Sequence, residues 1–214
     1  EVCLGNRLTA VIKETGELYL CGSISGQTMT TPTKVLPGQK IKQVATNQYS
    51  REGHIAAVTE SGDLYLWGDN QSGQIGNGKN ESNVLSPVQI LLEEKVKQVS
   101  LGDGHSAAVT EDGRLYLWGD NSFGQIGNGG KQVQYVPVEI SLDDQKVRQV
   151  HLAQCYSMAI TEAGDLYAWG VNDSGIIGKG TPSDTAKFFD KPQKITELKH
   201  VKAIDSETLR GFCN

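Results

Sequence analysis

The sequence has no long hydrophobic run and no block of positive charge. No apolar segment approaches the ~20 residues that a membrane-spanning helix needs, and no basic stretch followed by an apolar one opens the chain as in a secretory signal. Lysine and arginine are scattered singly, and the net charge is −5 at pH 7. Without a long apolar run, we expect no membrane span. Because an acidic surface repels phosphate backbones on average, we also expect no direct nucleic-acid partner.

The sequence also lacks the motifs of common catalytic and metal sites. It has no HExxH, no His-x-His pair and no G-x-S-x-G elbow. The repeated GQIGNG segment has neither the Lys-Ser/Thr of a phosphate-binding loop nor a following helix. We therefore expect no catalytic residue, no metal and no cofactor. The four cysteines form no CxxC pair and are expected to be buried free thiols in a reducing compartment: Cys3, Cys21, Cys155 and Cys213.

Glycine, in contrast, is abundant, and much of it lies in a segment that occurs three times. LYLWGDNQSGQIGNG begins at Leu64, LYLWGDNSFGQIGNG at Leu115, and LYAWGVNDSGIIGKG at Leu166. The glycine before each copy recurs at intervals of about 50 residues, a period typical of solenoids, propellers and arrays. We expect one domain over 1–214 with approximate repeats at 1–38, 39–92, 93–143 and 144–198, and part of another at 199–214.

Each repeat has the pattern of four short strands. In the third repeat KQVSL alternates, SAAVT is a run of small residues, RLYLWG alternates again, and VPVEI carries Pro137, which suits an edge strand. Turns such as TEDG place glycine where a positive φ is expected. Four antiparallel strands in each repeat of ~50 residues predict an all-β propeller of about four blades plus part of a fifth. The first repeat is expected to lack its leading edge, and the fifth to stop within its second strand.

The tryptophans and isoleucines of the repeated segment are expected to join the blades. Trp67, Trp118 and Trp169 would be buried wedges against the neighbouring blade. Ile75 and Ile126 would fill apolar space, while the glycines around them adopt conformations closed to other residues.

The segment HSAAVTEDGRLYLWGDNSFGQIGNG closely resembles the repeat of the regulator of chromosome condensation family, the seven-bladed propellers typified by the exchange factor for the GTPase Ran. The resemblance covers nearly the whole chain and is weakest in the first repeat, where Cys21 replaces the tryptophan. Seven blades would need ~350 residues at this period, so we expect a fragment of a larger propeller. Members serve as GTPase exchange factors, as modules of ubiquitin ligases, as a plant ultraviolet-B photoreceptor, and as bacterial inhibitors or effectors.

The resemblance also implies a partner-binding face. In the Ran exchange factor, Asp and His residues of the loop before the second strand face the partner. Carried over by position, this loop holds an Asp and a His in the third repeat, and the second repeat has a short insertion there. These positions differ between the repeats, as expected of loops shaped by a partner. The candidate partner-binding residues are Asn6, Arg7, Tyr49, Arg51, Glu52, His54, Asp103, His105, Gln154 and Tyr156.

These features favour a protein-binding propeller, with Ran-type nucleotide exchange on a small GTPase as the first hypothesis. The alternatives are a non-catalytic interaction module of a larger protein, such as a ubiquitin ligase subunit or a bacterial effector, and a protein inhibitor of another enzyme. The exchange factor uses an inserted wedge after one blade's WG, whereas the three WG loops here have one length and no insertion. A photoreceptor would need additional tryptophans on one face to absorb light. All three tryptophans of this sequence are the expected wedges between blades, so we reject this function. The expected location is the cytoplasm or nucleus, or the host cytosol for an effector.

Overall fold

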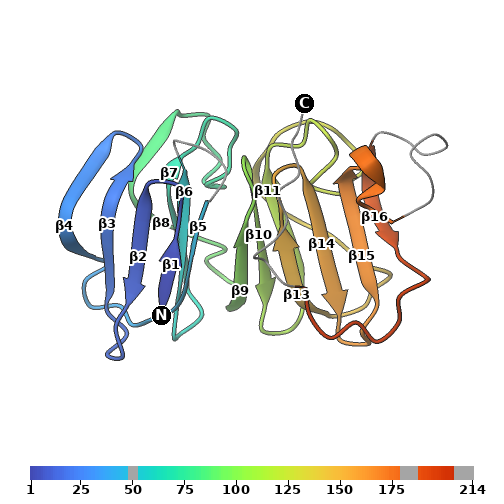
Figure 1. Cartoon of the computed structure of the whole chain (residues 1–214), viewed down its shortest axis with the longest axis horizontal. Helices are drawn as coiled ribbons and strands as arrows, with labels where there is room; N and C mark the ends of the chain where they lie inside the picture. The colour runs from blue at the N-terminus through green and yellow to red at the C-terminus, as the bar shows by residue number, and fades with distance from the viewer. Residues whose placement is uncertain (48–52, 179–187, 205–214) are drawn as a thin grey trace.

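The computed structural model describes residues 1–47, 53–178 and 188–204. These residues form four antiparallel sheets of four strands, each with its strands in chain order. The sheets follow one another side by side, from the blue N-terminal sheet to the orange C-terminal sheet (Figure 1). The prediction of an all-β chain built from four-stranded blades is confirmed, and the sheets are called blades 1 to 4 below.

The strands are short and evenly spaced, as the repeat predicts. Their bounds are β1 Val2–Leu4, β2 Leu8–Ile12, β3 Leu18–Ile24, β4 Gln27–Val35, β5 Ile41–Thr46, β6 His54–Thr59, β7 Leu64–Asp69, β8 Asn83–Ile90, β9 Val96–Leu101, β10 His105–Thr110, β11 Leu115–Gly119, β12 Gln134–Glu139, β13 Val147–Leu152, β14 Tyr156–Thr161, β15 Leu166–Val171 and β16 Phe188–Lys194. A single 3-10 turn, η1 Asp173–Gly175, is the only helical element in the described ranges. Within these ranges no helix is long and apolar enough to cross a membrane.

The second strand of each sheet lies between the first and third strands. Every residue of β6 and of β10 is buried, because these strands lie between two others and against the next blade. The small side chains of Ala107 and Ala108, both fully buried, allow that close approach. The outer edge is formed by β4, β8, β12 and β16. Pro87 and Pro137 lie on such edges, as expected, where a missing N–H breaks no ladder.

The first strands of successive blades are joined by glutamine side chains. Gln98 of β9 donates from Nε2 to the Val150 carbonyl (3.0 Å) and accepts at Oε1 from the Val150 N–H (3.0 Å). Gln43 of β5 makes the same pair of bonds with Val99 (3.1 and 3.0 Å). A side-chain amide thus replaces the missing ladder between sheets, which fixes the register of neighbouring blades.

The tryptophans lie at equivalent buried positions, as predicted. Trp118 and Trp169 are completely buried, and Trp67 is 4% exposed. The Trp118 ring covers Gly76 of blade 2, where an added Cβ would come within 2.7 Å of the indole. Gly76 also has φ 79°, which glycine adopts without strain. The repeated wedge therefore requires a glycine in the preceding blade as well as its own tryptophan.

The loop after each WG is held by one asparagine. Asn121 accepts at Oδ1 from the Ile126 N–H (3.0 Å) and donates from Nδ2 to the Gly130 carbonyl (2.9 Å). These bonds fold the loop so that Ile126 is fully buried. Asn70 holds Ile75 with the same bond (3.0 Å), and the predicted plug role of the two isoleucines is confirmed.

Both ends of the described chain hold incomplete parts of the repeat, and the expectation for the cysteines needs correction. The first strand of blade 1 is short, because β1 spans only Val2–Leu4 where it pairs with β2. Residues 201–204 form no strand, but Ile204 exchanges bonds with Gln149 (3.0 and 3.3 Å) as Val150 does with Gln98. The rest of the expected partial fifth repeat lies outside the described residues. Cys3 and Cys21 are free but only half-buried. Cys155 is disulfide-bonded, so a free thiol is wrong for that residue, and Cys213 lies outside the described residues.

Candidate functional site

The predicted partner-binding residues lie on or beside the loops between the first and second strands of the blades. We call these the rim loops; they comprise residues 5–7, 47–53, 102–104 and 153–155, of which 48–52 lie outside the described residues. In all four blades the residue after the WG glycine, or after Gly22 in blade 1, donates its N–H to a rim-loop carbonyl. The Asp120 N–H, for example, donates to the Gly104 carbonyl (2.8 Å). The rim loops therefore share one end of the molecule.

The glycine after each tryptophan brings the rim loop close to the third strand. Gly119 has φ 103°, and an added Cβ would lie 2.5 Å from the Gly104 carbonyl oxygen. The equivalent Gly170 would place a Cβ 2.5 Å from the Cys155 carbonyl oxygen. Any side chain at these positions would displace the rim loop, so WG sets the position of the candidate site as well as the wedge.

The rim loops are also linked from blade to blade. The Asn6 N–H donates to the Asn47 carbonyl (3.4 Å), which joins blades 1 and 2. Asn47 donates from Nδ2 to the carbonyls of Gly102 and Asp103, both at 2.7 Å, which joins blades 2 and 3. The Asp103 N–H donates to the Gln154 carbonyl (3.4 Å), which joins blades 3 and 4. The loops thus form one continuous rim.

Behind the rim lies a buried polar frame that connects each histidine with the next blade. His54 Nε2 is 2.9 Å from Ser106 Oγ, and Ser106 Oγ donates to the Gln74 carbonyl (2.7 Å). That carbonyl also accepts from Trp118 Nε1 (2.8 Å). The same frame recurs one blade further on, with His105 to Ser157 (3.2 Å), and with Ser157 (2.7 Å) and Trp169 (2.8 Å) to the Gln125 carbonyl.

The frame corrects the prediction for both histidines. His54 is 1% exposed and His105 is completely buried, so their side chains face the neighbouring blade and cannot contact a partner directly. Tyr156, which stands at the same position in blade 4, is 2% exposed and is corrected in the same way. The next blade covers both histidines, because His54 lies against Ser106 and His105 lies against Ser157.

Burial keeps both histidines neutral. Desolvation lowers the pKa of His54 to about 3, with a smaller contribution from His105. Desolvation also lowers the pKa of His105 to about 4, against the opposing effects of Asp120 and the Tyr156 backbone. A His–Ser pair is the arrangement of an activated nucleophile. Here each serine hydroxyl donates to a carbonyl and is fully buried, so the pairs are structural.

Four of the predicted residues remain at the surface, and we call them the rim residues. Asn6 and Arg7 are exposed, and Asp103 and Gln154 are half-buried. Tyr49, Arg51 and Glu52 lie outside the described residues, so their part in binding stays a prediction. Asp103 has a raised pKa, chiefly through burial; the Asn47 amide opposes this, while Asp120 and Asp69 add to it. The rim therefore carries one guanidinium group, two side-chain amides and the carboxylate of Asp103, which lies near the negative charges of Asp120 and Asp69.

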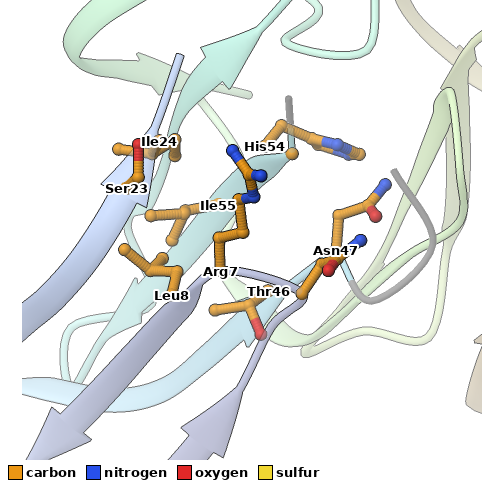
Figure 2. A pocket seen from close by; sticks show the side chains of 10 residues that line it. Arg7, Leu8, Ser23, Ile24, Thr46, Asn47, His54 and Ile55 are labelled. Carbon is orange, nitrogen blue, oxygen red and sulfur yellow. The ribbon is translucent and has the colours of Figure 1, made fainter. Parts of the chain in front are cut away.

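Between blades 1 and 2 the polar frame is replaced by apolar side chains. Leu8 stands in the histidine position and Ile55 in the serine position, opposite Trp67 in the ladder as Ser106 is opposite Trp118. They line a pocket with Arg7, Asn47 and His54 (Figure 2). Its volume is about 10 Å³, room for about one water molecule. The pocket is too small for an organic ligand, and the described residues contain no cluster of three or more His, Cys, Asp or Glu suited to a metal.

Sequence reasoning missed Asn47, which the repeat aligns with Gly5, Gly102 and Ala153. The sequence does contain one indication of its role, because a polar side chain replaces the small residue found at the start of the other rim loops. The pairing of frame residues also has a signal. Histidine in one repeat is followed by serine in the next, for both His54 and His105, whereas Leu8 is followed by Ile55.

Comparison with known protein families gives a direct match. A family model described as the regulator of chromosome condensation (RCC1) repeat matches residues 61–109, 112–160 and 163–207. A second model of the same repeat matches residues 96–125. The matches cover more than half of the chain.

Among curated proteins the chain is similar to members with different activities. It is 34% identical over 195 residues to the ultraviolet-B receptor UVR8 of Arabidopsis thaliana, covering 86% of this chain and 43% of the receptor. It is also 34% identical over 176 residues to the human E3 ubiquitin-protein ligase HERC2, covering 80% of this chain and 4% of the ligase. The chain thus spans less than half the length of each relative.

Among solved structures the chain is similar to further propellers. Human WBSCR16 gives a TM-score of 0.77 at 24% identity, covering 92% of this chain and 52% of that one. Yeast RCC1 (Prp20), solved bound to Kap60, gives 0.75 at 22% identity, covering 91% and 48%. At these identities the likeness concerns the fold, and it agrees with a partial propeller.

Proposed function

The chain belongs to the regulator of chromosome condensation (RCC1) repeat family, and on this premise we propose that it is a protein-binding propeller whose rim docks a partner. The observation that carries the proposal is the continuous hydrogen-bonded rim above a buried frame. The frame repeats between blades 2, 3 and 4, whereas the amino-acid sequence of the rim loop differs in every blade. A surface whose loops differ in sequence but rest on a rigid buried frame suits recognition. Such a surface loses little conformational entropy when the partner binds.

The finer proposal is that the partner is a small GTPase whose nucleotide the protein releases. Support comes from yeast Prp20p, whose structural study describes binding to Gsp1p and histones. A propeller that promotes release needs no catalytic residue, because binding the nucleotide-free state more tightly lowers nucleotide affinity. Under this proposal the protein acts where such GTPases occur, in the cytoplasm or nucleus. Arg7 and Asp103 are the rim residues that we propose contribute most, since charged groups there can anchor a partner.

The test is stimulated nucleotide release from a panel of purified small GTPases. We expect the double variant Arg7→Ala/Asp103→Ala to slow stimulated release at least about tenfold, since anchoring side chains cost about 2 kcal/mol or more each. Folding should persist because neither side chain belongs to the buried frame. The matched control is Glu14→Ala/Glu60→Ala, two exposed acids in the turns before the third strands, which should leave release unchanged. Full activity in the rim variant would exclude this site, and no stimulation of any GTPase would exclude exchange.

A second candidate is an interaction module of a larger protein such as a ubiquitin ligase. The observation that favours it is the set of WG loops, in which the same asparagine bond recurs in blades 2, 3 and 4 at 3.0 Å. The residues of these loops that the structure describes contain no inserted wedge. The similarity to HERC2 adds support. Measuring binding and release on the same GTPase separates the two, because a module would bind without accelerating release.

A further inference from the structure

One buried residue, Asn47, contacts the rim loops of three blades. Its N–H donates to the His54 carbonyl (3.1 Å) and closes its own loop, and its carbonyl accepts from Asn6 of blade 1 (3.4 Å). Its side-chain Nδ2 donates to Gly102 and Asp103 of blade 3, both at 2.7 Å. The residue is only 3% exposed. A partner can therefore scarcely reach Asn47, although it can reach the residues that Asn47 holds.

The side-chain link has no counterpart in the other repeats. Gly5, Gly102 and Ala153 occupy the equivalent positions and have no polar side chain. Between blades 3 and 4 the rim is instead joined by one longer bond, from the Asp103 N–H to the Gln154 carbonyl at 3.4 Å. Because a carboxamide has two N–H donors, Asn47 can bind two consecutive carbonyls and so fix the orientation of the peptide that carries Asp103.

We propose that Asn47 is the positioning residue of the rim, which holds the loops of blades 1 and 3 in one register so that Asn6 and Asp103 act as a single surface. Burial strengthens its two short hydrogen bonds relative to exposed ones. Where it concerns partner binding, this inference rests on the proposed function; where it concerns the register of the loops, it does not. The amide also favours the ionised form of Asp103, since it lowers the pKa of that carboxyl against the effect of burial.

The test compares Asn47→Ala with a control that loses the same kind of bonds elsewhere. Alanine is tolerated at this position in blade 4, as Ala153 shows. Asn47→Asp, which has the same shape but no donor, is the second variant in case the first fails to fold. The control is Gln98→Ala, which loses two bonds to Val150 between the first strands of blades 3 and 4.

Two readouts on the free protein decide the proposal. In Asn47→Ala, hydrogen exchange at the Asp103 amide should accelerate at least about tenfold, the effect of losing ~1.4 kcal/mol of hydrogen bonding. The Asn6 amide keeps its bond to the backbone carbonyl of residue 47 and should change less. The Ala153 amide, bonded to Tyr156 (3.0 Å), should change less than about twofold. The Asp103 carboxyl, followed by carbon NMR, should titrate at higher pH, a change that general destabilisation would not produce. Unchanged exchange and titration, or equal changes in Gln98→Ala, would overturn the proposal.

A third readout links the residue to partner binding. On any small GTPase that responds to the wild type, Asn47→Ala should reduce stimulated release about as much as Asp103→Ala, and the double variant should add little because both changes affect one surface. Additive losses would overturn the single-surface proposal. If no GTPase responds, the proposed nucleotide-exchange function fails. The hydrogen-exchange and pH-titration results still decide whether Asn47 positions the rim.

Discussion

Trp118→Ala is expected to lower the free energy of unfolding by about 3–5 kcal/mol. Trp118 is completely buried and lies over Gly76 of the preceding blade. Removing the ring leaves a cavity at the interface of blades 2 and 3, and it leaves the Gln74 carbonyl without one of its two donors. Small domains are stable by about 5–15 kcal/mol, so the loss is a large part of the total. Denaturant titration of the purified chain measures it.

A conservative variant separates packing from hydrogen bonding. Trp118→Phe keeps most of the apolar ring but loses the Nε1 bond to Gln74, and it should cost about 1–2 kcal/mol. Because the main strand contacts between blades join neighbouring blades, hydrogen exchange in Trp118→Ala should accelerate mainly in blades 2 and 3. A loss below 1 kcal/mol for the alanine variant (about the cost of an ordinary surface change), or equal loosening of all four blades, would contradict the wedge.

Acidification from pH 7 to pH 5 is expected to lower the unfolding free energy by about 4 kcal/mol through His54 and His105 together. Their pKa values are about 3 and about 4 in the folded protein, below the ordinary value of 6.5. The unfolded chain therefore binds protons at pH 5 that the folded chain does not. The stability is fully present above pH 6.5 and is lost as the pH falls toward the folded pKa values, at about 1.4 kcal/mol per pH unit for each imidazole.

Carboxylates account for little of this loss. Ion pairing lowers the pKa of groups such as Asp63 and Asp165, so they lose stability only below about pH 4. Asp69 and Asp103 have raised pKa values and act in the opposite sense. The double variant His54→Gln/His105→Gln keeps a donor for each serine but does not titrate, so its stability should change little between pH 7 and pH 5. If the double variant lost as much stability as the wild type, the histidines would not be the cause.

The repeat made most of the fold predictable. The period locates the blades, the small residues of β10 mark the buried strand, and the recurrence of Trp118 with Gly119 marks an interface that each blade forms in the same way. Such features follow from one local geometry repeated along the chain. The first strand of blade 1, β1, is only three residues long, too short to show an alternating pattern, and the sequence showed there only a repeat without its leading edge.

The site was less predictable because a rim loop lies at the boundary between surface and interface. His105 and Asp103 are separated by one residue, yet one is buried in the next blade and the other is half-exposed. No pattern within a single repeat distinguishes them; the distinction lies in the residue that the next repeat provides, which is Ser157 for His105. Asn47 was missed because its contacts reach across three blades, and the sequence position alone does not show them.

Site-specific photo-crosslinking tests the central claim most directly, namely that the rim is the face that binds the partner. A photoreactive amino acid would replace Arg7 or Gln154 on the rim, and Glu14 or Glu60 in the turns before the third strands, in the full-length protein within its own cells. We expect covalent partner adducts from positions 7 and 154 and none from positions 14 and 60. Adducts formed only from the turn positions, or equally from both sets, would contradict it.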